Sequence, residues 1–525
     1  MLPQLKKATP RTRPRRGPFR FDRRASGVLL HPTSLPGPHG CGDVGPAAFA
    51  FIDFLAAAGQ RWWQMLPVGP PGAPPGNGPY GSYSAFAGSP WLISPEVLRD
   101  DGFLDDADLA GGPGFADAAV NYRAMYRHRA RLLRRAFARF AQDARRRDAL
   151  DAFRQRERGW LDDFTLFSTI KAQHGGRAWL TWPRDLKLRL PAALATAQRE
   201  FADEIRFHAF CQFAFDQQWA RLRAYGHMKG VGLIGDIPIF VGLDSSDVWS
   251  NPDLFLLDAD GRPTFLSGVP PDDFCADGQR WGHPQYDWTA HRRTNFAWWI
   301  ARFASMMARF DGVRIDHFLG FLRAWGIPAR ARSARRGTWL PGPGRALFDA
   351  VKAALGDVPI IAEDLGVLTP EAAALRDRFK FPGMRVMQFG FGPGGDYHLP
   401  HRYPRRAVAY TGTHDNNTTA GWFADLVRRN GHAGSAITAE REKVMHYLKA
   451  PRSRSVPWQM IRAAMASVAD TVICPVQDIL GLGEEARMNV PGIAADQWKW
   501  RLPPGRLTPA LAARLRTLME LYDRA

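Results

Sequence analysis

The sequence predicts an α/β fold, a (β/α)8 barrel. Short apolar runs bounded by Gly, Pro and Asp recur along the chain, and helical stretches separate most of them. There are eight such runs, the number of strands that closes a barrel of this kind. The eight runs are 27–31 (GVLLH), 61–66 (RWWQML), 231–237 (VGLIGDI), 312–316 (GVRID), 358–363 (VPIIAE), 384–389 (MRVMQF), 407–411 (AVAYT) and 471–476 (TVICPV).

Two intervals are too long for a simple crossover and are expected to be insertions. In the first, about 95–204, Leu133, Phe137 and Phe140 recur at helical spacing among arginines, which predicts a packed helical subdomain. The second, about 242–288, is dense in Gly, Pro, Asp and Trp, which predicts ordered loops over the active face. Residues 26–525 are therefore expected to form one catalytic barrel domain with two insertions.

The first 25 residues are rich in Arg, Lys and Pro and predict a disordered basic tail. They contain no apolar segment of a secretory signal, and no run of about 18 apolar residues predicts a membrane span. The formal charge of +19 could indicate nucleic-acid binding, but beyond the tail the arginines alternate with acidic residues, so no nucleic-acid partner is expected. Four dispersed cysteines without a C-x-x-C pair favour a cytoplasmic protein.

The segment 310–321 (FDGVRIDHFLGF) carries the first candidate site. Its alternating pattern places Arg314 and Asp316 on one face of a strand that ends at this point. The arginine favours the ionised form of the aspartate, and an ionised carboxylate at the C-terminal end of a barrel strand is placed as a nucleophile would be. The alternative is a buried ion pair that only holds the strand end.

Three further carboxylates follow other expected strands. They are Asp236, Glu363 and Asp415, the last beside His414. Like charges that converge on one pocket repel each other, and such repulsion is tolerated where it tunes acid and base chemistry. A metal site is the main chemical alternative, because Asp316–His317 and His414–Asp415 are possible ligand pairs. However, no H-E-x-x-H, H-x-H after the first strand or phosphate-binding motif is present, so neither a metal nor a cofactor is expected.

Several aromatic residues lie outside regular patterns and favour a sugar ligand. They are Tyr80 and Tyr83 in a glycine-rich segment and Phe274 and Trp281 in the second insertion. Flat rings can stack on the C–H faces of glucose, although such residues can equally be the core of irregular loops. A sugar together with a carboxylate pair predicts glycosidic chemistry, in which one acid attacks the anomeric carbon and the other protonates the leaving oxygen.

A dozen motifs in order resemble the amylomaltases, the 4-α-glucanotransferases also called disproportionating enzymes. They cover nearly all of the chain after the tail: LLHPTSLPGPHGCGD (29–43), WWQMLPVGP (62–70), PYGSYSAFAGSP (79–90), IGDIPIFV (234–241), DSSDVWSNPDLF (244–255), GVPPDDF (268–274), RIDHFLGF (314–321), IAEDLG (361–366), MQFGF (387–391), THDNNTTAGW (413–422), QDILGLGEEARMNVPG (477–492) and QWKWRL (497–502). The resemblance implies a barrel of the α-amylase clan without that clan's C-terminal β-domain, and a retaining, two-step transfer between α-1,4-glucans without a cofactor.

The resemblance also implies a role for each site residue. Asp316 would be the nucleophile, Glu363 the general acid and then base, and Asp415 would bind hydroxyls of the distorted sugar. Arg314, His414 and Asp236 would complete that subsite, and Tyr80, Phe274 and Trp281 would stack on sugars. The expected partners are malto-oligosaccharides, glycogen or starch chains, and glucose as an acceptor.

Some positions depart from the family pattern. Asp273 stands where certain members have tyrosine, Cys275 where serine is usual, and His283 where W-G-N-P has asparagine. These departures leave the acceptor preference, the favoured chain length and any cyclising activity open. Two other functions also stay open: a hydrolase of the same clan, which would make new reducing ends, and a non-catalytic glucan-binding scaffold.

Overall fold

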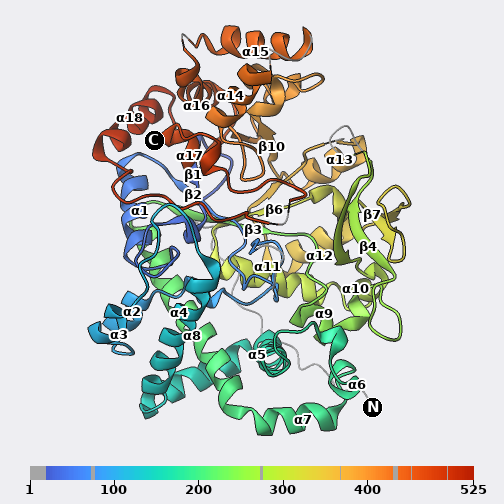
Figure 1. The fold of residues 1–525 in the computed structure, drawn as a ribbon. Helices are drawn as coiled ribbons and strands as arrows, with labels where there is room; N and C mark the ends of the chain where they lie inside the picture. The colour runs from blue at the N-terminus through green and yellow to red at the C-terminus, as the bar shows by residue number, and fades with distance from the viewer. Residues whose placement is uncertain are drawn as a thin grey trace.

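A closed barrel of eight parallel strands forms the centre of the protein, which was obtained as a computed structural model (Figure 1). The structure describes residues 19–72, 77–271, 276–366, 368–429, 435–450, 452–493 and 495–525. The strand order around the barrel is β1-β12-β11-β10-β9-β6-β3-β2. These strands are β1 (Ala25–Leu29), β2 (Trp62–Gln64), β3 (Gly232–Ile237), β6 (Gly312–Ile315), β9 (Ile360–Ala362), β10 (Gly383–Val386), β11 (Ala407–Tyr410) and β12 (Thr471–Pro475).

Each of the eight apolar runs in the sequence contributes one barrel strand, which confirms the predicted fold class. The barrel closes where β1 pairs with β12, from Ala25 opposite Thr471 to Leu29 opposite Pro475. Between β3 and β6, the register sets Asp236 beside Arg314. Since side chains alternate along a strand, Val313 and Ile315 face the helical layer while Arg314 faces the barrel interior.

Helices surround the barrel and provide most of its crossovers. These helices are α1 (Pro46–Ala57), α8 (Ala202–Met228), α11 (Ala297–Arg309), α12 (Arg345–Leu355), α13 (Pro370–Arg378), α14 (Thr419–Arg429), α16 (Val456–Ala466) and α18 (Pro509–Leu521). The connection from β10 to β11 contains only short 3-10 turns, at Met387–Gly390, Asp396–His398 and Pro400–Arg402. Short helices α9 (Ser246–Ser250), α10 (Trp288–Arg293) and α17 (Val476–Leu480) and the longer α15 (Ser435–Leu448) lie in loops between these elements.

The interval between β2 and β3 contains a group of helices. It comprises α2 (Pro95–Asp100), α3 (Asp106–Ala110), α4 (Tyr122–Phe140), α5 (Ala144–Gln173), α6 (Arg184–Lys187) and α7 (Pro191–Glu200). The apolar stripe of α4 faces α8, where the rings of Phe137 and Phe140 lie 5.5 and 4.8 Å from that of Phe210. This aromatic contact attaches the helical group to the barrel through α8.

A four-stranded antiparallel sheet stands beside the barrel, in the order β5-β4-β7-β8. Its strands are β4 (Phe265–Val269), β5 (Gln279–Pro284), β7 (Arg323–Pro328) and β8 (Thr338–Pro341). The sequence predicts only irregular loops for the 242–288 insertion, so β4 and β5 were missed. Both strands contain Gly, and β5 is also an edge strand that contains Pro and is largely half-buried, so neither shows a clear alternating pattern.

The expectation of a disordered tail over residues 1–25 is wrong for residues 19–25. Phe19 and Phe21 are buried, and their rings lie 5.6 and 4.8 Å from that of Trp62. They also cover Gly232 and Gly312, where an added Cβ would lie within 3 Å of a phenylalanine ring. Because Trp62, Gly232 and Gly312 begin β2, β3 and β6, the two rings close the N-terminal end of the barrel. Residues 1–18 lie outside the described residues.

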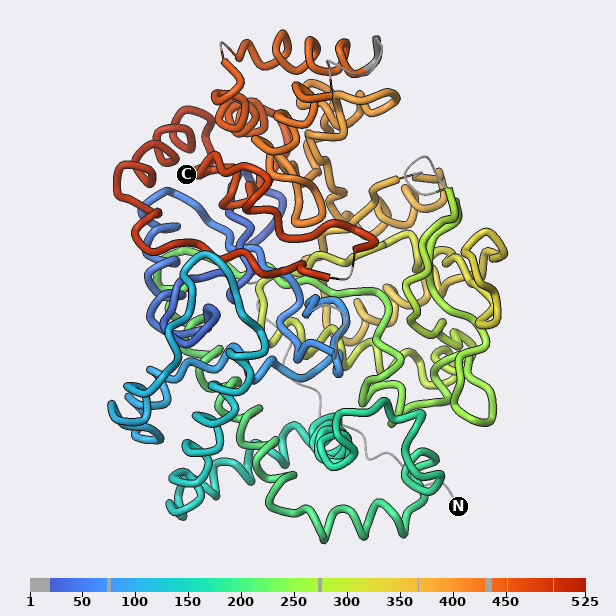
Figure 2. Tube along the Cα trace, in the orientation of Figure 1, coloured from blue at the N-terminus to red at the C-terminus, as the bar shows by residue number. Residues whose placement is uncertain are grey.

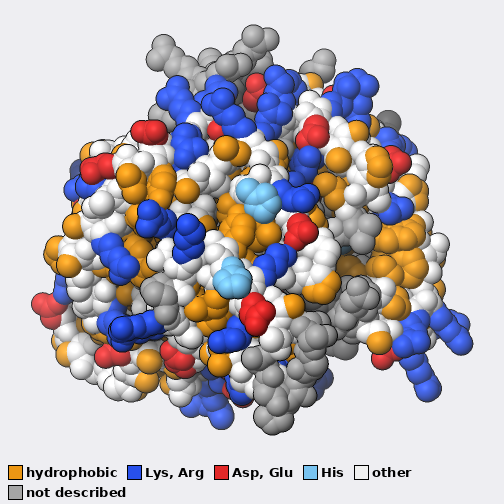
Figure 3. All heavy atoms as spheres, turned by 90° about the horizontal axis from the view of Figure 1, so that it is seen from above, with side chains coloured by type: hydrophobic (Ala, Val, Ile, Leu, Met, Phe, Trp, Pro, Cys, Tyr) orange, Lys and Arg blue, Asp and Glu red, His pale blue; other side chains and the backbone are white. Residues whose placement is uncertain are grey.

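The two ends of the described chain lie side by side, since Arg524 Nη1 donates to the backbone carbonyl of Ala25 at 3.1 Å and Arg24 Nη2 donates to that of Tyr522 at 2.9 Å (Figure 2). Figure 3 looks onto the top of the molecule as drawn in Figure 1, where α14 to α16 lie, and shows Lys and Arg side chains spread over this face with Asp and Glu among them. Within the described ranges, no helix is long and apolar enough to cross a membrane.

Candidate active site

A cleft of about 500 Å³ opens at the C-terminal end of the barrel strands. Three of the predicted carboxylates, Asp316, Glu363 and Asp415, line it together. Further lining comes from Tyr80 and from β5, which contributes Trp281 and His283. The sequence analysis expects four strand-end carboxylates at one pocket. Three of them line this cleft, whereas Asp236 is buried and lines a neighbouring cavity that shares Tyr80.

Arg314 connects two of the carboxylates. One nitrogen of its guanidinium, Nη1, donates to both oxygens of Asp236 at 2.9 and 2.7 Å, and Nη2 donates to Asp316 Oδ1 at 2.6 Å. Burial alone would lower the pKa of Arg314, but the charges of Asp236 and Asp316 outweigh it and hold the pKa well above its usual range. Arg314 is thus a permanent cation that holds Asp316 by a charge-assisted hydrogen bond.

Glu363 has a different environment. Its Oε2 accepts the backbone N–H of His317 at 2.7 Å, and its Oε1 accepts that of Leu365 at 2.8 Å. Burial and then the Asp316 charge raise the pKa of Glu363 to about 7, although Arg314 and the two backbone donors oppose the shift. The site therefore holds one carboxylate beside a cation and a second carboxyl that can carry a proton near neutral pH, which is the division that acid catalysis with a nucleophile requires.

Tyr80 joins Asp236 to the loop that follows β11. Its hydroxyl donates to Asp236 Oδ2 at 2.6 Å and lies 2.8 Å from His414 Nε2. The two rings stack, with centroids 5.3 Å apart, and His414 Nε2 is 3.4 Å from Asp415 Oδ2. Of these four residues, Tyr80 and Asp415 line the cleft, and Asp236 and His414 contact them.

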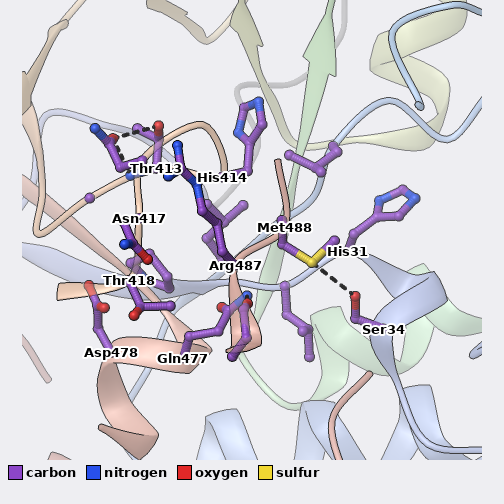
Figure 4. Close-up of a pocket in the computed structure, with 17 residues that line it drawn as sticks. His31, Ser34, Thr413, His414, Asn417, Thr418, Gln477, Asp478, Arg487 and Met488 are labelled. Atoms are coloured by element: carbon purple, nitrogen blue, oxygen red, sulfur yellow. Dashed lines mark hydrogen bonds between the residues drawn. The ribbon is translucent and has the colours of Figure 1, made fainter. Parts of the chain in front are cut away.

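The segment after β12 forms hydrogen bonds with the loop that carries His414 and Asp415 and with the residue that follows that loop. Asp478 accepts the backbone N–H and the hydroxyl of Thr419, both at 2.7 Å. Arg487 Nη2 donates to the backbone carbonyl of Asp415 at 3.1 Å. Figure 4 shows Thr413, His414, Asn417 and Thr418 on this loop, with Asp478 beside Thr418 and Arg487 alongside the loop.

One polar contact to the candidate catalytic acids was not anticipated. Asn489 Nδ2 donates to Asp415 Oδ1 at 2.6 Å, and Asn489 lines the cleft. The two residues are 74 positions apart, so no local pattern in the sequence connects them. Other lining residues to which the sequence analysis gave no role are Gly78, Gly81, Pro238, Ile239, Phe240, Gln279, Pro491, Gly492, Ile493 and Trp498.

The aromatic candidates have different positions. Trp281 lines the cleft, and its ring lies edge-on to that of His317 at 5.0 Å. Tyr83 instead packs against Phe167 of α5, with Lys171 4.8 Å from its ring centre. Phe274, like Asp273 and Cys275, lies outside the described residues. Within the described part of the chain, no cluster of three or more His, Cys, Asp or Glu residues could hold a metal ion.

Comparison with known sequences assigns the chain to a family. The sequence profile of the family described as 4-alpha-glucanotransferase matches residues 30–508. The chain belongs to this family. A 4-alpha-glucanotransferase of Thermus thermophilus is 46% identical over 511 residues, with 95% of this chain and 99% of the relative covered. A chloroplastic/amyloplastic 4-alpha-glucanotransferase of Solanum tuberosum is 40% identical over 521 residues, with 97% of this chain and 88% of the relative covered.

Solved structures agree with the assignment of the chain to the 4-alpha-glucanotransferase family. An amylomaltase from Streptococcus agalactiae, solved in complex with acarbose, superposes with a TM-score of 0.90 at 37% identity and covers 96% of this chain and 100% of its own. The amylomaltase of Corynebacterium glutamicum, at 18% identity and a TM-score of 0.72, shares the fold; 94% of this chain and 73% of that chain are covered. The family resemblance read from the motifs is therefore confirmed.

Proposed function

We propose that the protein transfers a segment of an α-1,4-glucan to the 4-hydroxyl of glucose or a malto-oligosaccharide, by a retaining double displacement through a covalent glycosyl-enzyme. The single observation that carries this proposal is the contrast between two carboxyls of one cleft. Asp316 accepts from the Arg314 cation, whereas burial and the Asp316 charge raise the pKa of Glu363 to about 7. One group is prepared to attack and the other to donate a proton.

In the first step, Asp316 attacks the anomeric carbon while Glu363 gives its proton to the leaving glycosidic oxygen. Arg314 stabilises the attacking carboxylate at 2.6 Å, and the backbone donors at His317 and Leu365 fix the direction of the acid. Asp415, Tyr80 and His414 would bind hydroxyls of the sugar whose bond breaks. Their mutual contacts hold them in place before substrate arrives, so little free energy is spent on ordering them.

In the second step, Glu363 is ionised and removes the proton from the acceptor hydroxyl, which attacks the glycosyl-enzyme. Transfer rather than hydrolysis requires a bound sugar to reach the intermediate before water does. Trp281 and His283 on β5 supply a wall at which such an acceptor could lie. We therefore assign the acceptor side of the cleft to the 242–288 insertion and the barrel to the chemistry.

The test is to incubate the purified protein with maltotriose alone and to follow the oligosaccharide ladder and the total number of reducing ends. Glucose and longer chains should form at constant reducing ends, because transfer makes one glycosidic bond for each one that it breaks. Asp316→Asn should give no ladder. Rising reducing ends without longer chains would identify a hydrolase instead, and maltotriose binding without any reaction would identify a scaffold.

A further inference from the structure

His283 stands in the wall of the catalytic cleft, at a position where the family pattern has asparagine. It belongs to β5, where side chains at alternate positions share a face, and Gln279, Trp281 and His283 all line the cleft. Arg280, between them in the sequence, points away and donates to the carbonyl of Ala329. The side chains of Gln279, Trp281 and His283 therefore form a row along the same cleft that Asp316 and Glu363 line.

This row is connected to Glu363 through His317. The Trp281 ring packs edge-on against His317, and the backbone N–H of His317 donates to Glu363 Oε2. Tyr80 and Asp415 also line the cleft, and His414 contacts both of them. Because Glu363 would exchange its proton with the leaving oxygen and then with the acceptor hydroxyl, a sugar next to β5 is the leaving sugar in the first step and the acceptor in the second.

The imidazole of His283 is available to such a sugar. Neither a hydrogen bond nor a ring contact to another described residue involves it, although its neighbours Trp281 and Gln285 both make such bonds. Burial lowers the pKa of His283 to about 4, against the opposing charge of Asp316. The ring is therefore neutral near pH 7, with one nitrogen that donates and one that accepts, and a sugar hydroxyl can use either.

We propose that His283 binds hydroxyls of the acceptor sugar and thereby sets how well a glucan competes with water for the glycosyl-enzyme. This inference rests on the proposed transferase function and adds a residue that determines acceptor specificity. Trp281 supplies the apolar surface for the same sugar, and His283 supplies its orientation. A sugar held by the Trp281 ring and by hydrogen bonds to His283 is positioned for attack on the glycosyl-enzyme, whereas a water molecule has no such set of contacts to orient it.

The experiment compares His283→Ala and His283→Asn with the wild type, using α-maltosyl fluoride as donor and maltose as acceptor. The initial burst of fluoride release, before the first turnover is complete, reports the donor step, since no acceptor takes part in it and fluoride carries no sugar to contact β5. His283→Ala should release fluoride as the wild type does, but should raise the KM for maltose about tenfold and increase the share of hydrolysis. His283→Asn keeps one hydrogen-bond donor and one acceptor, so its KM for maltose should lie between those of the wild type and His283→Ala. The matched control is His446→Asn, an exposed histidine on α15.

An unchanged KM for maltose in His283→Ala would overturn the proposal. So would a fall in fluoride release as large as the fall in transfer, because His283 would then act on the donor side or on the fold. If the wild-type protein releases fluoride but never forms longer chains in the presence of maltose, the transferase function itself fails, which is a result distinct from either of these.

Discussion

The ion pair between Arg314 and Asp236 provides a quantitative test of how the site is held together. The Asp236 side chain is 0% exposed and that of Arg314 is 5% exposed, whereas Asp316 is 34% exposed. Replacing Arg314 by methionine would leave Asp236 as a buried carboxylate without its cation. Removing one partner of a buried pair costs about 3–5 kcal/mol of unfolding free energy. Asp316 adds little to this loss because water can solvate it.

The double variant Asp236→Asn with Arg314→Met should recover most of the lost stability. It removes both charges, and the asparagine oxygen can still accept the Tyr80 hydroxyl, so replacing the whole pair is expected to cost about 1 kcal/mol or less. The pH dependence gives a second signature. In Arg314→Met alone, Asp236 takes up a proton on acidification more readily than in the wild type, so the stability gap to the wild type should narrow as pH falls.

The assay is urea unfolding or thermal melting at a fixed scan rate for the wild type, both single variants and the double variant. A coupling between the two substitutions of about 2 kcal/mol or more is expected from these costs. A double variant as unstable as Arg314→Met would refute the reasoning, since the loss would then not come from an unpaired buried charge. Activity is not the readout, because Arg314 also contacts the proposed nucleophile.

Three further predictions follow from other contacts. The kcat/KM for maltotriose should fall as pH rises through about 7, because the raised pKa of Glu363 sets where the acid loses its proton, and a rate that stays flat to high pH would contradict this. Asn489→Ala should lower kcat/KM by about 10- to 150-fold, since a hydrogen bond to a charged group contributes about 1.5–3 kcal/mol, and a normal rate would mean that Asp415 does not need this contact. Phe21→Ala should lower the unfolding free energy by about 3–5 kcal/mol and leave the KM for maltotriose unchanged, because the ring closes the end of the barrel remote from the cleft. An unfolding transition equal to that of the wild type would show that Phe21 does not stabilise the barrel.

The barrel was predictable because its strands are buried on both faces. Such strands appear in the sequence as short continuous apolar runs, and Gly, Pro and Asp mark their ends. Once eight runs are counted, the position of Asp316, Glu363 and Asp415 follows from one rule, since residues just after parallel barrel strands meet at one face. That rule depends on position along each strand and needs no knowledge of contacts between strands.

The remaining features depend on contacts that the local sequence does not encode. Asn489 and Arg487 reach Asp415 across more than 70 positions, and only the folded chain brings them together. Strand β5 was hidden because an edge strand with Gly and Pro has no clear alternation. Phe19 and Phe21 were assigned to the tail because the segment around them is basic in composition. In the structure, both phenylalanines are buried against the end of the barrel.

The central claim is that Asp316 forms a covalent bond to the sugar and that Glu363 acts on the oxygen. The most direct measurement is to mix Glu363→Gln with α-maltosyl fluoride and to examine the protein by mass spectrometry. Fluoride needs no acid to leave, so the first step should proceed while the second, which needs the base, is slow. We expect the protein to gain one maltosyl unit, carried on the peptide that contains Asp316. A sugar attached to another residue, or no adduct while fluoride is released at the full rate, would contradict the account.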